Sequence, residues 1–498
     1  MSKIEKSMRI YVFFSIIDLT VGSLGMLLYG IFTATYGPVW VRNQYIGLWL
    51  LTILFFYSIQ SLYLELRTWS TKFGYFLDVV YFSISVILTL ILAIFYCIPP
   101  RIDGLIWAFY IFAVNLTNVA ILFLKRHHLN NLARPESKDF QYVIMQIVKV
   151  LNFLLRVIFL VVICFLINGA SQEAIGKSRY PSRGKFVDLK ISDSDSKTVK
   201  FHFLCDGPSS NKPLFLFEGS ASHGLADYLS IQRLLKQNSR RSCIWDKPGL
   251  GYSDYLLTDI KSHYQLYDNL INSLDESGPY HFVGWGGGGS LIYEYAFNHP
   301  EKFESMIFID AAPNDVEIQI RKKIKNWSDA QAEDYKNSLY SERKATFGAI
   351  NGLGVPFGLM APFSPNYEPF FPELSDEVKW YFLTEKTWIT QEYFLKSALT
   401  GKDVFSTYKI NQSIPINVIT TVKSDDQIRE KCRKNGYSVD SEKCKYDLDF
   451  NRELIVIRKS LKDLSSNGKL FECSDDECDL GFYVGKGANY TVDKLLQI

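Results

Sequence analysis

A run of glycines between a predicted strand and a predicted helix is the segment of this chain best placed to do chemistry. Residues 284–289 read GWGGGG; they follow the β-rich residues 280–283 and precede a helical pattern over 290–298. The letters fit G-x-G-x-x-G, and Asp310 follows about 20 residues later, which is the spacing of a dinucleotide-binding loop. Glycines let a phosphate approach the backbone, and amides at the start of a helix attract anions. These residues alone leave nucleotide binding open as an alternative.

Four segments of the chain resemble the α/β-hydrolase family. Residues 281–300 (HFVGWGGGGSLIYEYAFNHP) resemble its strand, nucleophile elbow and helix, where the family carries G-x-S-x-G. The other three are 243–254 (CIWDKPGLGYSD), similar to the family's D-x-P-G-x-G-x-S segment, 217–220 (FEGS), similar to its oxyanion loop, and 307–313 (IFIDAAP), similar to the strand before its cap. The resemblance covers roughly residues 195–498. It fits better than a dinucleotide-binding domain, which usually opens with its glycine loop.

The register of this resemblance places Gly286 where the family carries its nucleophilic serine. A valine–glycine pair before the elbow and a histidine–proline pair after it fix the alignment. In the family, the sharp turn presents a serine oxygen next to backbone amides that stabilise an oxyanion. A glycine keeps the turn and removes the oxygen. Ser290 lies about one helical turn further on, so it is a poor substitute.

The resemblance also implies an acid and a base. The acid would follow the predicted strand 414–421, where Asp425 and Asp426 stand, with Asp310 as an alternative. The base would be a histidine after the last strand, but residues 479–490 contain none. Without an imidazole, no evident group takes the proton from a nucleophile.

The same resemblance implies a set of residues that line the former active site or its oxyanion loop: Glu218, Gly219, Ser220, His223, Trp285 and Gly287. His223 is expected to line the pocket or support the structure rather than act as a relocated base. No metal or cofactor is expected, because no paired CxxC motif occurs and no histidine follows His299.

The elements that position these residues can be read from periodicity. Beyond residue 200, short β-rich segments alternate with helical patterns, which predicts βαβ units and a mostly parallel sheet. The predicted strands are 200–204, 213–217, 241–245, 280–283, 305–309, 414–421 and 469–473. The interval 314–405, rich in Trp, Phe, Pro and Lys, breaks this alternation and predicts an inserted helical cap. The hydrolase-like domain is therefore expected over 200–498.

Residues 1–170 are expected to form a membrane domain. Five apolar stretches approach or exceed the roughly 20 residues that a helix needs to cross a bilayer; they are 10–33, 45–65, 74–98, 104–124 and 147–169. Asp18, Asp78 and Arg156 lie within them, where an unpaired charge costs several kcal/mol, so Arg156 is expected to pair with an acid. Residues 171–199 are polar and are expected to be a linker.

Lysines and arginines in the short loops set the expected orientation. They gather on the side of the N-terminus, so the N-terminus is predicted to be cytosolic and the C-terminal domain lumenal or extracellular. An oxidising compartment fits the six cysteines of that domain: Cys205, Cys243, Cys432, Cys444, Cys473 and Cys478. It also fits three glycosylation motifs, at Asn326, Asn411 and Asn489. By the resemblance, Cys205 and Cys243 lie on neighbouring strands and are expected to pair; Cys432–Cys444 and Cys473–Cys478 are then the local pairs.

The charge balance excludes one class of function. There are 54 Lys and Arg against 52 Asp and Glu, so no large field of one sign favours nucleic acid. The expected partners are the lipid bilayer and a lipid, peptide or protein ligand. The missing serine and histidine favour a membrane-anchored, catalytically degenerate pseudohydrolase. The alternative is an α/β-hydrolase with rearranged chemistry that acts on esters or lipids near the membrane.

Overall fold

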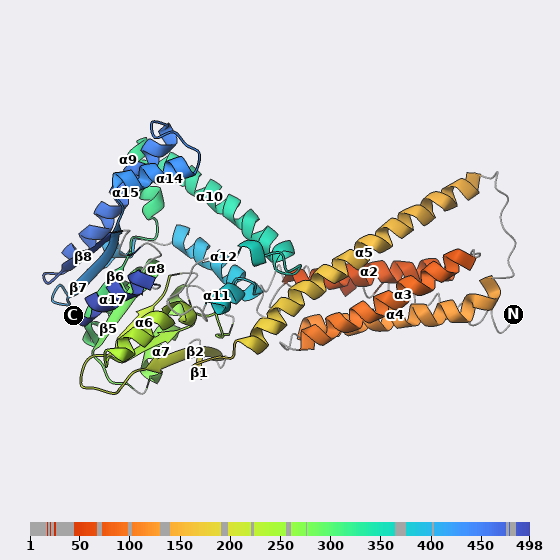
Figure 1. The fold of residues 1–498 in the computed structure, drawn as a ribbon, viewed down its shortest axis with the longest axis horizontal. Coiled ribbons are helices and arrows are strands. Elements are labelled where there is room, and N and C mark those ends of the chain that lie inside the picture. The colour runs from red at the N-terminus through yellow and green to blue at the C-terminus, as the bar shows by residue number, and fades with distance from the viewer. Residues whose placement is uncertain are drawn as a thin grey trace. The chain divides into compact units, whose positions relative to one another are not determined.

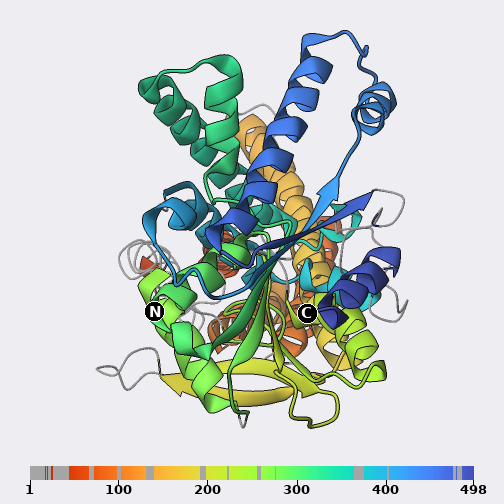
Figure 2. The ribbon, with the colours of Figure 1, turned by 90° about the vertical axis from the view of Figure 1, so that its left-hand side faces the viewer.

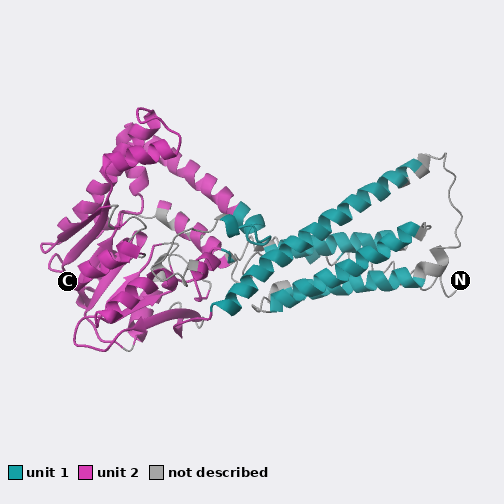
Figure 3. Ribbon diagram, in the orientation of Figure 1, with its two compact units in different colours: residues 1–180, 349–363, 383–385 teal, residues 181–348, 364–382, 386–498 magenta. Residues whose placement is uncertain are grey.

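The chain forms two compact units in the computed structural model, and each is described by itself (Figures 1 and 3). Unit 1 contains residues 1–180, 349–363 and 383–385, and unit 2 contains residues 181–348, 364–382 and 386–498. The structure describes residues 17, 20, 24–25, 44–66, 72–97, 102–129, 140–190, 198–220, 224–254, 260–274, 276–363, 375–400, 403–474, 478 and 485–498.

Long apolar helices make up unit 1. They are α2 (Gln44–Leu66), α3 (Lys72–Cys97), α4 (Ile102–Leu129) and α5 (Phe140–Arg179). Among the described residues, four helices are long and apolar enough to cross a membrane, over Ile46–Leu64, Phe73–Cys97, Leu105–Leu124 and Gln146–Arg179. These match four of the five predicted spans. The first predicted span, 10–33, and Asp18 with it, lies outside the described residues apart from positions 17, 20, 24 and 25.

A buried ion pair joins α3 and α5, as expected for Arg156. Its Nη1 lies 2.5 Å from Oδ1 of Asp78, and its Nε donates to Oε1 of Gln60 at 3.0 Å. The guanidinium also lies 4.8 Å from the ring centroid of Tyr81. Burying this charge is tolerable because an acid, an amide and an aromatic face surround it.

The segment expected to be a linker is partly regular structure. Helix α5 continues through Arg179, so residues 171–179 are helical, and it stops just before Pro181, which cannot extend a helix. Strand β1 (Lys185–Lys190) then pairs antiparallel with β2, so the sheet begins before residue 200. This strand escaped prediction because its residues are mostly exposed or half-buried and only Leu189 is buried.

Unit 2 is built on an eight-stranded, mostly parallel sheet. The strands after β1 are β2 (Thr198–Asp206), β3 (Phe215–Glu218), β4 (Ser242–Trp245), β5 (Tyr280–Trp285), β6 (Phe303–Ile309), β7 (Ile416–Val422) and β8 (Lys469–Ser474). Their order is β1-β2-β4-β3-β5-β6-β7-β8. Only β2 runs antiparallel to its neighbours β1 and β4; the other pairs are parallel. All seven predicted strands are confirmed.

Helices cover both faces of this sheet (Figure 2). They include α6 (Leu225–Gln237), α7 (Ile260–Ser273), α8 (Gly287–Asn298), α13 (Val404–Thr407), α14 (Asp425–Lys434), α15 (Glu442–Ser460) and α17 (Gly485–Leu496). Because both faces are covered, the central strands are largely apolar and buried, and Leu216, Phe282 and Phe308 are fully buried.

The interval between β6 and β7 is helical, as predicted for a cap. It holds α9 (Val316–Lys325), α10 (Asp329–Ala349), α11 (Ser375–Tyr381) and α12 (Glu385–Thr400), with short turns at Ile350–Gly354 (η3) and Ala361–Phe363 (η4). Residues 349–363 belong to unit 1 rather than to unit 2, which the sequence did not predict.

The six cysteines of unit 2 pair as predicted. Cys205 and Cys243 face each other on β2 and β4, with a Cα–Cα distance of 4.0 Å. Cys432–Cys444 joins α14 to α15, and Cys473–Cys478 follows β8. The side chains of Asn326, Asn411 and Asn489 are exposed, so they are accessible to modification, and glycosylation stays a prediction.

Candidate functional site

The turn between β5 and α8 has the conformation of a nucleophile elbow. Gly286 adopts φ 51° and ψ −120°, a region that L side chains enter only under strain. Its amide donates to the carbonyl of Ile309 on β6 at 3.0 Å, and its carbonyl accepts from the amide of Gly289 at 3.1 Å. The sheet and the helix therefore hold this strained residue from both sides, although it carries no hydroxyl.

Close backbone packing explains part of the glycine run. A β-carbon on Gly288 would lie 2.3 Å from the carbonyl oxygen of Glu218, so only glycine lets α8 approach the end of β3. At Gly286 the nearest group would be the Ser220 hydroxyl, 3.1 Å away. At Gly287 nothing lies closer than Asn314 Oδ1, at 4.0 Å. Ser220, Gly286 and Gly287 therefore lie around one turn, and their role in a binding site stays a prediction.

Ser290 lies in the helix that follows the elbow. It lies in the first turns of α8, its side chain is buried, and its hydroxyl has no hydrogen-bond partner among the described residues. Trp285, just before the elbow, is half-buried and lies edge-on to Tyr228, with 6.2 Å between ring centroids.

The candidate acids are engaged elsewhere. Asp425 is half-buried, and its hydrogen-bonded ion pair with Arg452 on α15 lowers the pKa of its carboxyl. Asp426 is exposed and pairs with Arg429 one turn later on the same helix. Neither carboxylate contacts a histidine among the described residues.

Asp310 forms a separate cluster at the ends of β6 and β7. Its carboxylate accepts from the Thr420 hydroxyl at 3.0 Å, from the amide of Thr421 at 3.0 Å and from Arg458 on α15 at 2.8 Å. These contacts satisfy the carboxylate, so it is not available to orient a base or to bind a ribose.

The base that the family needs has no counterpart after β8 in the sequence. His223 lies outside the described residues. His281, at the start of β5, contacts the Ser305 hydroxyl at 2.8 Å and stacks on Phe215. Burial, and then the charge of Arg240, lower the pKa of His281 to about 4. It is a core residue of the sheet.

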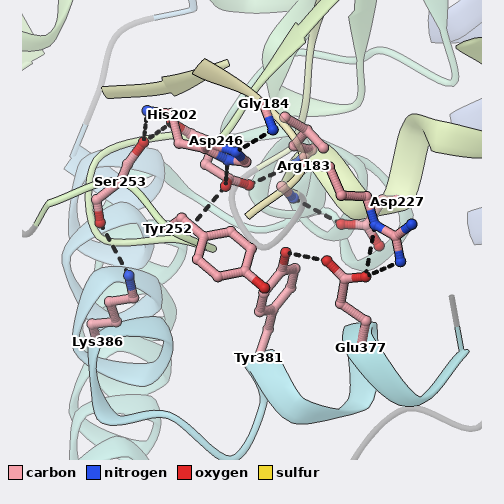
Figure 4. A network of polar contacts seen from close by, with 12 residues as sticks. Arg183, Gly184, His202, Asp227, Asp246, Tyr252, Ser253, Glu377, Tyr381 and Lys386 are labelled. Carbon is pink, nitrogen blue, oxygen red and sulfur yellow. Dashed lines mark hydrogen bonds and ion pairs between the residues drawn. The ribbon is translucent and has the colours of Figure 1, made fainter. Parts of the chain in front are cut away.

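An aspartate–histidine pair does exist, and the sequence did not reveal it (Figure 4). Nδ1 of His202 on β2 lies 2.7 Å from Oδ2 of Asp246, and both side chains are fully buried. Nε2 of His202 accepts from the amide of Gly184 at 3.1 Å. Both ring nitrogens are therefore occupied by the protein, so this histidine cannot serve as a general base in this arrangement.

Asp246 organises the loop that resembles D-x-P-G-x-G-x-S. Its carboxylate also accepts from the amides of Leu225 at 2.7 Å, at the start of α6, and Tyr252 at 2.9 Å. Ser253 donates to the Asp246 carbonyl at 2.6 Å and accepts from the His202 amide at 2.9 Å. The motif therefore joins β2, β4 and α6, and its polar residues serve the structure.

A second polar pair links residue 183 to the cap helix α11. Arg183 donates to Oε2 of Glu377 at 2.8 Å, and the Tyr381 hydroxyl donates to Oε1 of Glu377 at 3.2 Å (Figure 4). Burial, followed by the negative charges of Asp246 and Glu377, raises the pKa of Tyr381 well above its ordinary value. Tyr381 therefore stays a hydrogen-bond donor at any physiological pH.

A buried ion pair lies beside the elbow. Glu218 pairs in register with Gly284 of the elbow strand, and its side chain is 1% exposed. Its carboxylate accepts from Trp245 Nε1 at 2.8 Å and lies 2.8 Å from Lys247 Nζ. Glu218 thus fixes the end of β3 from inside the domain, and its side chain is not available to a ligand.

Comparisons with known proteins find one relative by sequence and several solved structures of similar fold. No protein-family model matches the chain. An uncharacterised protein of Schizosaccharomyces pombe is 33% identical over 145 residues, which cover 24% of this chain and 27% of that protein. The chain thus spans little more than a quarter of this relative.

Three solved structures illustrate the likeness. An esterase from Thermogutta terrifontis is 13% identical, with 63% of this chain and 97% of the esterase covered and a TM-score of 0.42. An epoxide hydrolase from Acinetobacter nosocomialis is 14% identical, with 66% of this chain and 94% of that chain covered and a TM-score of 0.44. An α/β hydrolase from a Medee basin metagenome is 14% identical, with 60% of this chain and 91% of that chain covered and a TM-score of 0.36. At such low identity and TM-score no residue role is transferred. The sheet topology, the elbow conformation and the order of the motifs together give unit 2 an α/β-hydrolase fold.

Proposed function

We propose that unit 2 is a catalytically inactive α/β-hydrolase domain, anchored to a membrane by unit 1, that binds a lipid, peptide or protein ligand at its former active-site edge. The observation that carries this proposal is Gly286, which keeps φ 51° and ψ −120° but supplies no oxygen. A strained turn costs free energy of folding, so its presence without a nucleophile favours a role in shaping a binding surface.

The surrounding groups support the absence of triad chemistry. Asp425 and Asp310 are held by Arg452 and Arg458, and His202 is held by Asp246 and Gly184. The sequence has no histidine after His299. A nucleotide ligand is less well supported, because the carboxylate that would bind its ribose, Asp310, already has protein partners.

The membrane anchor and its orientation are supported by three features. The four described helices are long and apolar enough to span a bilayer. The positive charges of the short loops favour a cytosolic N-terminus. The three disulfides of unit 2 fit an oxidising compartment, so we place unit 2 in the lumen or outside the cell.

Activity-based labelling tests the loss of catalysis. The purified full chain should not react with a fluorophosphonate probe or turn over short esters, and Gly286→Ser should not gain efficient turnover, because a serine without a base is a weak nucleophile. A known serine hydrolase serves as the positive control. Robust wild-type turnover that survives Ser290→Ala would establish rearranged chemistry instead. Turnover abolished by Ser290→Ala would place the nucleophile at Ser290.

Ligand retention tests the binding role. Native mass spectrometry of the full chain in detergent should show a retained mass that Gly287→Trp reduces, because a bulky side chain would occupy the space next to the elbow. Gly287→Ala is the matched control, since a β-carbon there meets nothing closer than 4.0 Å. Equal retention in all three proteins would place the ligand elsewhere.

A further inference from the structure

Residues 349–363 lie between cap helices in the sequence but belong to unit 1 in space (Figure 3). Their sequence, AINGLGVPFGLMAPF, contains no charged residue. In a soluble cap, an exposed connection of this length would normally carry polar side chains. The composition instead suits a segment that lies against membrane helices.

Side chains of α2 and α5 hold this segment directly. The ring of Trp49 lies tilted against Phe357, with 5.0 Å between ring centroids, and Phe165 stacks on Phe357 at 5.7 Å. Trp49 lies near the start of one candidate span, and α5 becomes polar just after Ile167. The segment therefore meets the bundle at an end of its apolar region, the level at which tryptophan is enriched in membrane proteins.

Three backbone carbonyls of the segment accept hydrogen bonds from side chains of the bundle. Trp49 Nε1 donates to the Gly352 carbonyl at 2.8 Å, Asn168 Nδ2 donates to the Phe357 carbonyl at 3.1 Å, and Gln172 Nε2 donates to the Gly358 carbonyl at 3.0 Å. Within the segment, amides donate to carbonyls three to five residues earlier, as from Leu359 to Gly354 at 2.7 Å. Irregular backbone near the membrane core needs such partners, because lipid offers none.

The packing is close enough to require a glycine on α5. A β-carbon on Gly169 would lie 2.2 Å from the carbonyl oxygen of Pro356. The close contact between α5 and the segment therefore depends on a glycine at position 169.

Two leucines of the segment face outward. Leu353 is 47% exposed and Leu359 is 42% exposed, while Val355 and Met360 are buried. Aliphatic side chains near the C-terminal end of α5 are also exposed, for example Ile175. An apolar surface continuous with candidate membrane spans is most simply covered by lipid.

We propose that residues 349–363 form an interfacial membrane anchor, in which Leu353 and Leu359 insert among the lipids of the bilayer surface. This inference rests on the proposed membrane embedding of unit 1. It goes beyond a simple tether, because it makes a piece of the cap interval a lipid-contacting element.

Spin labels test the anchor in the full chain reconstituted in phosphatidylcholine vesicles. Cys97→Ser and Cys164→Ser remove the free cysteines of the described residues, and single labels are attached through Leu353→Cys or Leu359→Cys. Ile87→Cys on α3, at a side chain 57% exposed, reports on the bundle, and Val456→Cys on α15, 62% exposed, reports on unit 2. Collision rates with oxygen and with a water-soluble nickel chelate are compared.

We expect the oxygen-to-nickel ratio at positions 353 and 359 to approach that at 87 and to exceed that at 456. Ratios at 353 and 359 equal to that at 456, with a high ratio at 87, would overturn the anchor and leave the membrane bundle intact. A low ratio at 87 would overturn the membrane embedding itself. Near-ultraviolet circular dichroism confirms that each variant is folded.

Discussion

Oδ2 of Asp246 lies 2.7 Å from Nδ1 of His202, and neither side chain is exposed to solvent. Such a pair looks like two members of a catalytic triad, but the second ring nitrogen of His202 receives the amide of Gly184. The pair therefore ties β2 to the loop after β4.

Replacing Asp246 should destabilise unit 2 strongly. Asp246→Ala leaves two buried donors, from His202 and Leu225, and one partly buried donor, from Tyr252, without an acceptor. Each orphaned donor costs about 1–3 kcal/mol, so we expect a loss of at least roughly 3 kcal/mol in unfolding free energy. Thermal unfolding of the full chain in detergent measures it. The exposed Asp426→Ala is the matched control and should change stability by no more than about 0.5 kcal/mol; equal midpoints for both variants would contradict the structural role.

The two neighbouring glycines of the elbow should respond differently to alanine. Gly286→Ala places a side chain at φ 51° and against the Ser220 hydroxyl, so it should cost about 1–3 kcal/mol. The β-carbon of Gly287→Ala would make only an ordinary van der Waals contact, with Asn314, so this variant should be neutral or stabilise by up to about 1 kcal/mol, because it restricts the unfolded chain. Thermal midpoints compare them. If Gly286→Ala were as stable as Gly287→Ala, the elbow would not be strained.

The disulfides should contribute according to the loops that they close. Cys205 and Cys243 are 38 residues apart, and Cys473 and Cys478 are 5 apart. Loop-closure entropy then predicts a loss of about 4 kcal/mol when the first bridge is replaced by alanines and about 2 kcal/mol for the second. Non-reducing peptide mapping checks the pairing beforehand. Finding Cys205 and Cys243 as free thiols would contradict both the pairing and this ranking.

Local patterns predicted much of the fold. The seven strands and the pairing of Arg156 with an acid were predicted because apolar runs and charges in apolar segments each constrain structure locally. The elbow was predicted from the resemblance of residues 281–300 to the α/β-hydrolase family. The edge strand β1 was missed, because a half-exposed strand such as 185–190 has little apolar content to show.

The contacts between distant parts of the chain could not be predicted in the same way. His202 meets Asp246 across 44 residues, and Trp49 meets Gly352 across 303 residues. No periodicity links residues so far apart. Nothing in the sequence around His202, or in the apolar loop of the predicted cap, pointed to these contacts.

Unit 2 should lose stability in mild acid partly through His281. Its pKa is lowered from 6.5 to about 4 in the folded protein, so below pH 6.5 the unfolded chain takes up a proton that the folded chain does not. The folded state therefore loses up to about 2 kcal/mol at pH 5 from this group, and nothing above pH 7. His281→Gln should show a smaller fall in thermal midpoint between pH 7 and pH 5 than the wild type. An identical fall in both proteins would show that His281 does not titrate in this way.

Finally, Gly169→Ala should release residues 349–363 from the bundle. Alanine favours a helix over glycine by about 1 kcal/mol, but its β-carbon would lie 2.2 Å from the Pro356 carbonyl oxygen, and overpacking of this kind costs about 1–3 kcal/mol. The backbone of α5 and the backbone of the segment cannot move independently, so we expect the cost of the clash to exceed the gain in helix propensity. Hydrogen exchange of peptides covering 349–363 should then accelerate, while exchange in β5 and β6 stays unchanged. Ile175→Ala, at an exposed position on the same helix, is the matched control. Unchanged exchange of 349–363 in Gly169→Ala would mean that the segment is not held by α5.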